Sequence, residues 1–272
     1  MEKKKIVYIA VTTICIIAIV LVIVAMMQKG AKPSQNTTNT MEGKTDAEEI
    51  KEEFEALFNN ELQIGNYDTS NITLVAADKP LVYTAYHLTD KREGKYDINI
   101  DIPILNVSNP VADEINRNTQ DVFAEKANNI MLGSNANTIY TIDYQAFINQ
   151  DMVSIIIRAT LKEGDNPQRV IIQTYNYNFV TQQLVTIDEV LQIKGIQYID
   201  AENKIKRNIE EANRQAESLK NLGYEVYSRN VNDERYLLNK TTNFLVANNY
   251  RVYAIYAYGN NNYTSEYDLV AF

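Results

Sequence analysis

Cysteine, histidine and tryptophan are almost absent from this sequence. Of its 272 residues, one is a cysteine (Cys15), one is a histidine (His87) and none is a tryptophan. A disulfide needs two cysteines, and a structural zinc site needs several Cys or His ligands. The sequence therefore excludes an intrachain disulfide and a Cys/His zinc centre. The one cysteine, Cys15, lies in an apolar run, so the rest of the chain has no cysteine that could act as a nucleophile.

The single histidine limits the hydrolases that the chain can resemble. A Ser-His-Asp arrangement would have to use His87, which lies in a segment that we predict as a strand, and no G-x-S-x-G elbow is found. Metal-dependent polysaccharide deacetylases typically need two histidines and an aspartate on the metal. A glycosidase with two catalytic carboxylates is compatible with the composition. The 35 acidic residues offer no means of choosing that pair.

The sequence has one long apolar run, at residues 6–27. As a helix of 22 residues it would be about 33 Å long, enough to cross the hydrocarbon core of a bilayer. Lys3, Lys4 and Lys5 precede it, which predicts a single-pass signal anchor in the cell membrane with a cytoplasmic tail at 1–5 and the remaining domain outside. A cleaved signal peptide has a shorter apolar region and an A-x-A-like site. A lipoprotein would need its cysteine at the end of the run.

Negative charge dominates the rest of the chain. The net charge is −9, and without the four lysines and one glutamate that flank the run it is near −12. Such a domain should repel nucleic acid and anionic lipid, and should favour a basic partner. The alternative is that an acidic exterior merely keeps a surface protein soluble.

The order of elements predicts an α+β fold. A polar spacer at 28–45 precedes a short amphipathic helix at 46–60, which begins with a capping box of Thr45 and Glu48. Alternation predicts a strand at 96–104, and a first long helix follows from Asn109 to Gly133. Three strands at 138–148, 152–162 and 168–180 follow as a meander. A second capping box at Thr186 precedes a second long helix, which ends at Gly223. The predicted chain then returns to strands, at 242–247, 250–258 and 266–272.

We therefore expect antiparallel sheets with two long amphipathic helices packed on them, and no regular βαβ alternation. Two small extracytoplasmic domains are predicted, at 70–135 and 136–272. Asp97 and Asp101 share the polar face of the strand at 96–104, which could suggest calcium. No EF-hand-type loop surrounds them, so a solvated strand face is the favoured interpretation.

Three stretches carry a family resemblance: residues 100–116, residues 175–191, and residues 242–259 without the segment 245–249. They resemble the tandem domains in the ectodomains of lysozyme-sensing anti-sigma factors of Gram-positive bacteria, and in the accessory region of a class of peptidoglycan deacetylases. The resemblance covers about residues 81–272. Many members have a Gly-Ala-His-like turn where this chain has residues 165–169. The deacetylase catalytic domain is absent, and five residues before the anchor are too few to hold a sigma factor.

Tyrosines are the candidate ligand-binding residues. The sequence has 19 of them, and Tyr175 with Tyr177, and Tyr256 with Tyr258, fall on shared strand faces. Tyrosine is common at glycan- and protein-binding surfaces, although it also favours cross-strand packing in any sheet.

The sequence thus predicts a non-catalytic binding domain of the bacterial cell envelope, without cofactor, metal or nucleic acid. The resemblance and the acidic exterior point to a basic protein such as lysozyme, or to a peptidoglycan-type glycan. A carbohydrate hydrolase that uses a carboxylate pair and a structural partner of another membrane protein are the alternatives.

Overall fold

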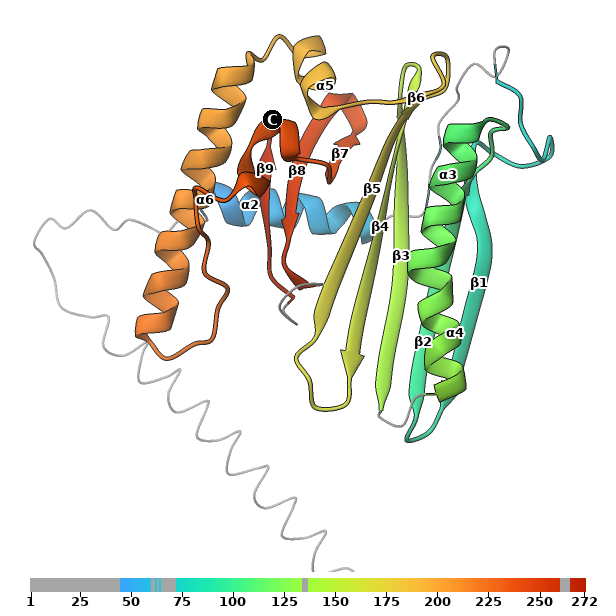
Figure 1. Ribbon diagram of the computed structural model, residues 1–272, viewed down its shortest axis with the longest axis horizontal. Helices are drawn as coiled ribbons and strands as arrows, with labels where there is room; N and C mark the ends of the chain where they lie inside the picture. The colour runs from blue at the N-terminus through green and yellow to red at the C-terminus, as the bar shows by residue number, and fades with distance from the viewer. Residues whose placement is uncertain (1–44, 60–61, 63, 65–71, 134–136, 260–264) are drawn as a thin grey trace, which may run out of the picture. The chain divides into compact units, whose positions relative to one another are not determined.

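The computed structural model describes residues 45–59, 62, 64, 72–133, 137–259 and 265–272 (Figure 1). The predicted cytoplasmic tail, anchor and most of the spacer lie outside these residues. Within the described ranges, no helix combines the length and the apolar character that crossing a bilayer requires.

A six-stranded sheet in the order β1-β2-β3-β4-β5-β6 forms the larger part of the fold. Its strands are β1 (Val82–Arg92), β2 (Tyr96–Leu105), β3 (Thr138–Asn149), β4 (Met152–Glu163), β5 (Arg169–Asn178) and β6 (Gln183–Leu184). Every neighbouring pair is antiparallel except β2 and β3, which are parallel. The α+β class and the predicted meander are confirmed.

The prediction of purely antiparallel sheets is wrong at the junction of β2 and β3. The first long helix connects these two strands. It carries the chain back to the end of the sheet at which β2 begins, so β3 runs in the same direction as β2. Five residue pairs, from Tyr96–Thr138 to Ile100–Ile142, consequently join β2 and β3 in parallel. The predicted division near residue 135 falls inside this crossover, so one sheet contains strands from both sides of it.

The crossover consists of α3 (Pro110–Thr119), the π-helical turn η2 (Gln120–Ala124) and α4 (Glu125–Gly133). Asn109 caps its start, because its side-chain oxygen accepts from the amides of Val111 and Ala112, both at 3.0 Å. Phe123, Ala127 and Ile130 are buried in one core with the inward residues of β2 and β3. The predicted helix from 109 to 133 is confirmed, with a π turn in its middle.

A second, three-stranded antiparallel sheet is formed by β7 (Phe244–Ala247), β8 (Arg251–Ala257) and β9 (Tyr267–Ala271). The helices α5 (Ile187–Ile193) and α6 (Tyr198–Asn221) pack on one of its faces, with Ile205 and Ile209 buried against Val252, Ala254 and Val270. A Schellman motif ends α6: Gly223 adopts a φ of +91°, and the amide of Tyr224 donates to Leu219 at 3.1 Å. The predicted stop at Gly223 is confirmed.

The two sheets pack against each other through a third core, which also contains α2 (Asp46–Ala56) and the 3-10 turn η1 (Leu57–Asn59). Alternate residues of the central strands serve different cores: Ile155 and Ile157 face α3 and α4, whereas Ile156 faces the small sheet. The layers are therefore helix, large sheet, small sheet and helix (Figure 1). Both predicted capping boxes, at Thr45 and Thr186, are present.

Candidate functional site

The four predicted ligand-binding tyrosines lie inside the protein. Tyr177 and Tyr258 are fully buried, Tyr256 is 6% exposed, and Tyr175 is half-buried. Tyr175 and Tyr177 belong to the core beneath α3 and α4, whereas Tyr256 and Tyr258 belong to the core beneath α5 and α6. The structure thus brings each pair together but separates the two pairs. The burial of Tyr177, Tyr256 and Tyr258 supports the packing interpretation for these three rings, whereas a binding role for the half-buried Tyr175 stays a prediction.

The polar face of the large sheet carries His87 and the aspartates that suggested calcium. His87 Nδ1 lies 2.8 Å from Asp101 Oδ1, and Asp97 pairs with Lys91. All four side chains are substantially exposed. Among the described residues, no group of three Asp, Glu, His or Cys side chains is arranged to hold a metal ion. This face is a solvated ladder of cross-strand pairs.

A shallow hollow of about 340 Å³ on the same sheet brings two carboxylates together, Asp101 and Asp143, beside Tyr83 and Tyr144. Asp143 accepts two hydrogen bonds from Arg158, at 3.1 and 2.6 Å, and Asp101 pairs with His87. A glycosidase pair needs one protonated carboxyl and one free carboxylate. Each of these two groups instead faces a basic side chain, an arrangement typical of surface pairing.

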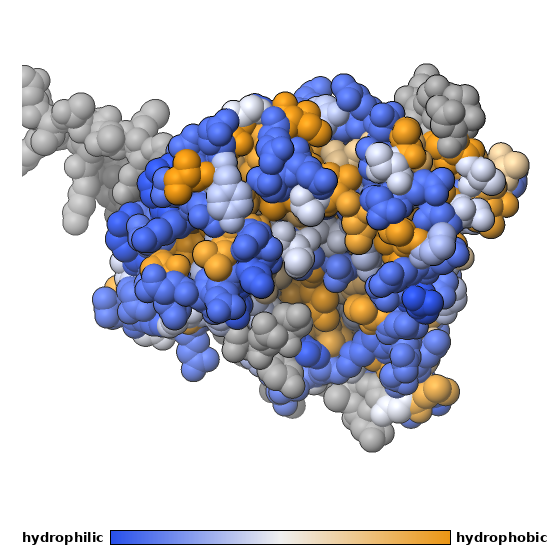
Figure 2. Space-filling model, turned by 45° about the horizontal axis from the view of Figure 1, so that its top comes forward, coloured by the Kyte–Doolittle hydropathy of each residue, from blue (hydrophilic) through white to orange (hydrophobic). Residues whose placement is uncertain are grey.

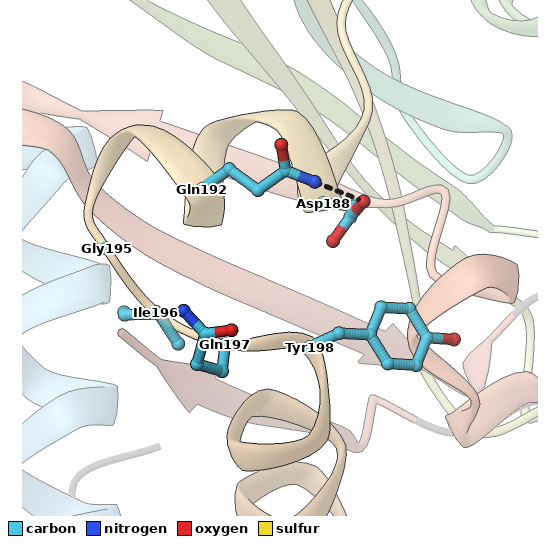
Figure 3. A pocket seen from close by; sticks show the side chains of 6 residues that line it. All are labelled: Asp188, Gln192, Gly195, Ile196, Gln197 and Tyr198. Atoms are coloured by element: carbon cyan, nitrogen blue, oxygen red, sulfur yellow. Dashed lines mark hydrogen bonds between the residues drawn. The ribbon is translucent and has the colours of Figure 1, made fainter.

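A second hollow, of about 260 Å³, lies where α5 turns into α6 (Figure 3). Its wall includes Asp188, Gln192 and Tyr198, and the side chain of Gln192 donates to Asp188 at 2.9 Å. In Figure 3 the phenol ring of Tyr198 points away from the other side chains, so the polar groups do not converge on a common centre.

A groove of about 560 Å³, larger than the two hollows above, lies between α2 and α6, with the start of β9 as its floor. We call it the α2/α6 groove. Its walls come from three segments distant in sequence: the first turns of α2, the second half of α6, and residues 225–229. The volume lies within the range of ligand pockets, about 300 to 1,000 Å³.

Small side chains explain why the groove exists. Ala212 and Ala216 lie one turn apart on α6, and Ala47 lies opposite on α2. Residues four apart share one face of a helix, so the two alanines leave a continuous depression where longer side chains would fill the space. Ile50 and Leu269 add apolar surface. At its end, Leu219 is 42% exposed, and Leu222 and Tyr224 continue the apolar surface at 75% and 63% exposure.

The charges around the groove are mainly negative. Its lining contains the acidic residues Glu48, Glu211, Glu225, Glu266 and Asp268, against the basic residues Lys51 and Arg229. Arg229 is committed to Glu266 and Asp268, and Glu211 pairs with Arg214 at the rim. The groove therefore combines apolar surface on its walls with an acidic rim, which suits a partner that presents apolar and basic side chains together. Figure 2 shows one face of the molecule, on which apolar patches are interspersed with polar surface.

A buried polar network anchors one side of the groove. Arg229 Nε lies 2.9 Å from Asp268 Oδ2, and its Nη2 lies 2.9 Å from Oδ1. The Tyr258 hydroxyl donates to Asp268 at 2.6 Å and lies 2.7 Å from the hydroxyl of Tyr236. Because each hydroxyl has one proton, Tyr236 donates to Tyr258. The ring of Tyr227 stacks on Tyr258 with centroids 4.0 Å apart.

The network shifts the protonation of its members. Burial alone would lower the pKa of Arg229, but its hydrogen bond with Asp268 and the negative charge of that carboxylate outweigh burial and raise the pKa. Burial raises the pKa of Tyr258, and the charge of Asp268 raises it further. Burial also raises the pKa of Tyr236 to about 12. The arginine stays charged and the phenols stay neutral at ordinary pH, so the network holds residues 227–229 beside β9.

Sequence reasoning missed this groove. The apolar seam of α6 was visible as Ile205, Ile209, Ala212, Ala216 and Leu219, but we expected all of it to pack on the sheet. Ile205 and Ile209 of its first half are buried in the core on that sheet, whereas Ala212 and Ala216 of its second half line the groove, Ala212 partly exposed and Ala216 buried. The change from isoleucine to alanine along the seam is the signal that could have identified it. Nothing near Arg229 in the sequence indicates its pairing with Asp268.

Comparisons with known proteins give distant structural neighbours, among them two DUF3298 family proteins. No family model and no curated protein matches the sequence. A DUF3298 family protein from Pseudomonas aeruginosa PAO1 is 11% identical, with a TM-score of 0.38, over 71% of this chain and 90% of that protein. A DUF3298 family member from Bacteroides fragilis NCTC 9343 is also 11% identical, with a TM-score of 0.29, over 59% of this chain and 74% of that protein. Similarity at this level carries no functional argument.

Proposed function

We propose that this chain is a membrane-anchored, extracytoplasmic, non-catalytic binding domain that captures a basic protein of the bacterial envelope in the α2/α6 groove, with lysozyme as the specific candidate. The observation that carries the proposal is the apolar surface on the walls of the groove beneath an acidic rim, in a domain whose net charge is strongly negative. Charge complementarity of this kind steers a basic partner to its site and suppresses acidic competitors.

Other observations agree with a binding role. The apolar run at 6–27 supports attachment to a membrane, and the resemblance of residues 81–272 to lysozyme-sensing ectodomains supports lysozyme as the partner. Leu222 and Tyr224 lie next to the groove and are mostly exposed, so the apolar surface that a partner could bury extends beyond the groove itself. A surface of this kind fits a protein better than a small polar metabolite.

The test is a calorimetric titration of the full chain, in detergent solution, with lysozyme and with soluble peptidoglycan fragments. We expect lysozyme to bind at low salt and to bind about tenfold or more weakly at about 0.5 M salt, because exposed charges are screened at that ionic strength. Absence of lysozyme binding at low salt would remove lysozyme as the partner. Binding of the glycan fragments alone would replace a basic protein with a wall glycan.

A further inference from the structure

The outer edge of β9 is an unpaired strand edge inside the α2/α6 groove. β9 is the last strand of the small sheet, and among the described residues only β8 pairs with it. Phe272 and Val252 exchange both backbone hydrogen bonds, at 2.8 and 3.3 Å, and the amide of Tyr258 donates to the carbonyl of Glu266. Backbone groups alternate in direction along an antiparallel strand. Those of Tyr267, Leu269 and Ala271 therefore point away from β8, toward the groove side.

The opposite edge of the same sheet is closed. At β7, the amide of Phe244 donates to the hydroxyl of Thr174 at 2.9 Å, and its carbonyl accepts from the side chain of Asn176 at 2.8 Å. The side chain of Asn149 donates to the carbonyls of Val246 and Ala247, at 3.3 and 3.0 Å. Side chains of the large sheet thus satisfy both outward groups of Phe244 and the outward carbonyl of Val246. An unprotected edge is a template for another strand, and proteins usually cover it.

The groove runs along the outer edge of β9 over residues 265–269, where Leu269 is partly exposed and Tyr267 is 8% exposed, whereas Ala271 lies beyond the groove and is buried. The two helices beside the groove pack on opposite faces of the strand. Phe54 of α2 shares a core with Tyr267 and Ala271, whereas Ile209 of α6 shares a different core with Val270. The hollow of about 560 Å³ lies between these helices, over residues 265–269.

We propose that a partner binds the α2/α6 groove by strand addition: an extended peptide segment pairs with the backbone of β9 at Tyr267 and Leu269. This inference rests on the proposed function, since it assigns the binding mode at the same site. Main-chain hydrogen bonds provide affinity in this mode, and pockets for alternate side chains provide specificity.

The two walls specify the side chains of the segment. Successive side chains of an added strand point alternately toward α2 and toward α6. On the α6 side, Ala212 and Ala216 accept apolar side chains, while Glu211 and Glu225 at the rim favour basic ones. On the α2 side, Ile50 accepts an apolar side chain. A segment in which valine-like and lysine-like residues alternate fits both walls, and an acidic segment does not.

Hydrogen exchange at single amides tests the proposal on the full chain. The probe is a capped eight-residue peptide of alternating lysine and valine, and its control carries N-methyl groups on the valines, which keep the charge but block one side of strand pairing. We expect the probe to slow exchange at Tyr267 and Leu269 about tenfold or more, and the control to do so far less, because each lost main-chain hydrogen bond weakens pairing. The amides of Asp268 and Val270, which face β8, serve as internal references.

Each other outcome overturns strand addition. Equal protection by both peptides would mean that charge alone binds the probe, and no protection would mean that the edge is not the site. Amides that are protected before the probe is added, and released on dilution, would show a second copy of the chain at the edge. Protection that is independent of concentration would show a segment of the same chain there. If lysozyme binds without slowing exchange at Tyr267 and Leu269, strand addition fails and the proposed function stands.

Discussion

Arg229 and Asp268 face each other through two parallel hydrogen bonds of 2.9 Å each, in a site where their side chains are 8% and 12% exposed. The pair joins the segment after α6 to β9, two regions that no backbone hydrogen bond connects among the described residues. Tyr258 adds a third contact to the same carboxylate. This network therefore fixes one wall of the α2/α6 groove.

Removing the charge of Asp268 should destabilise the protein strongly. Asp268→Asn leaves the buried guanidinium with Glu266 as its remaining charged partner, and breaking a buried pair costs about 3 kcal/mol. Urea denaturation monitored by circular dichroism measures the free energy of unfolding. The matched control is Arg214→Gln, which breaks the exposed pair of Arg214 with Glu211 on α6 and should cost far less, because water screens both charges. Equal costs for the two variants would contradict the structural role of the network.

Asn176 should be important for the packing of one sheet on the other. Its side chain donates to the carbonyl of Phe244 at 2.8 Å and accepts from Ser154 at 2.6 Å, at a position that is 3% exposed. Asn176→Ala leaves these buried groups unsatisfied, which costs about 2 kcal/mol. Thermal unfolding compared with the exposed control Asn239→Ala measures the effect. A cost as small as that of the control would show that water replaces the lost contacts.

The ion pairs of Glu163 predict a pH dependence of stability. Its carboxylate lies 2.9 Å from Lys126 Nζ and 2.6 Å from Arg169 Nη2. The hydrogen bond from Lys126 outweighs partial burial, so the pKa of Glu163 is lowered in the folded protein from its ordinary value of 4.5. The stabilisation is complete above that value and is lost as the pH falls through the lower, folded-state pKa.

Glu163→Gln should therefore cost about 1 kcal/mol at pH 7 and nearly nothing well below pH 4. Urea denaturation over this pH range measures the difference. The control is Glu125→Gln, at an exposed position of α4 next to Lys126. A cost that stays constant with pH would mean that Glu163 stabilises the fold by packing and not by charge.

Filling the groove should weaken binding and leave the stability of the fold nearly unchanged. Ala212→Leu projects a larger apolar side chain into the hollow between α2 and α6, in a position that is only partly buried. We expect lysozyme affinity to fall at least about tenfold, equivalent to about 1.4 kcal/mol, while the free energy of unfolding changes by less than about 0.5 kcal/mol. Ser218→Leu, at an exposed position of α6 outside the groove, is the control. Equal loss of affinity in both variants would place the binding site elsewhere.

Local signals predicted the elements well because their causes are local. The capping boxes at Thr45 and Thr186, the cap at Asn109 and the stop at Gly223 each depend on residues within a few positions, and all four are present in the structure. The parallel pairing of β2 with β3 depends on where the intervening helix returns the chain. A periodic pattern in the sequence contains no such information.

The candidate site was much less predictable. Alternation places Tyr177 and Tyr258 on strand faces correctly, but it does not say whether a helix covers that face. The α2/α6 groove combines segments from about residues 47–51, 208–219, 225–229 and 265–269, and its shape depends on which side chains fail to fill the space. Such a site follows from tertiary packing, so only the change from isoleucine to alanine along α6 hints at it.

The most direct test of the central claim, that the acidic α2/α6 groove binds a basic envelope protein, is the change in lysozyme affinity on reversing charges at its rim. The variant Glu211→Lys with Glu225→Lys is compared, by calorimetry at low salt, with Glu114→Lys plus Asp121→Lys, which changes the net charge equally on the exposed face of the other helical layer. We predict that the rim variant loses affinity at least about tenfold more than the control, because the rim charges lie next to the bound partner. Equal losses in the two variants would contradict the groove as the binding site.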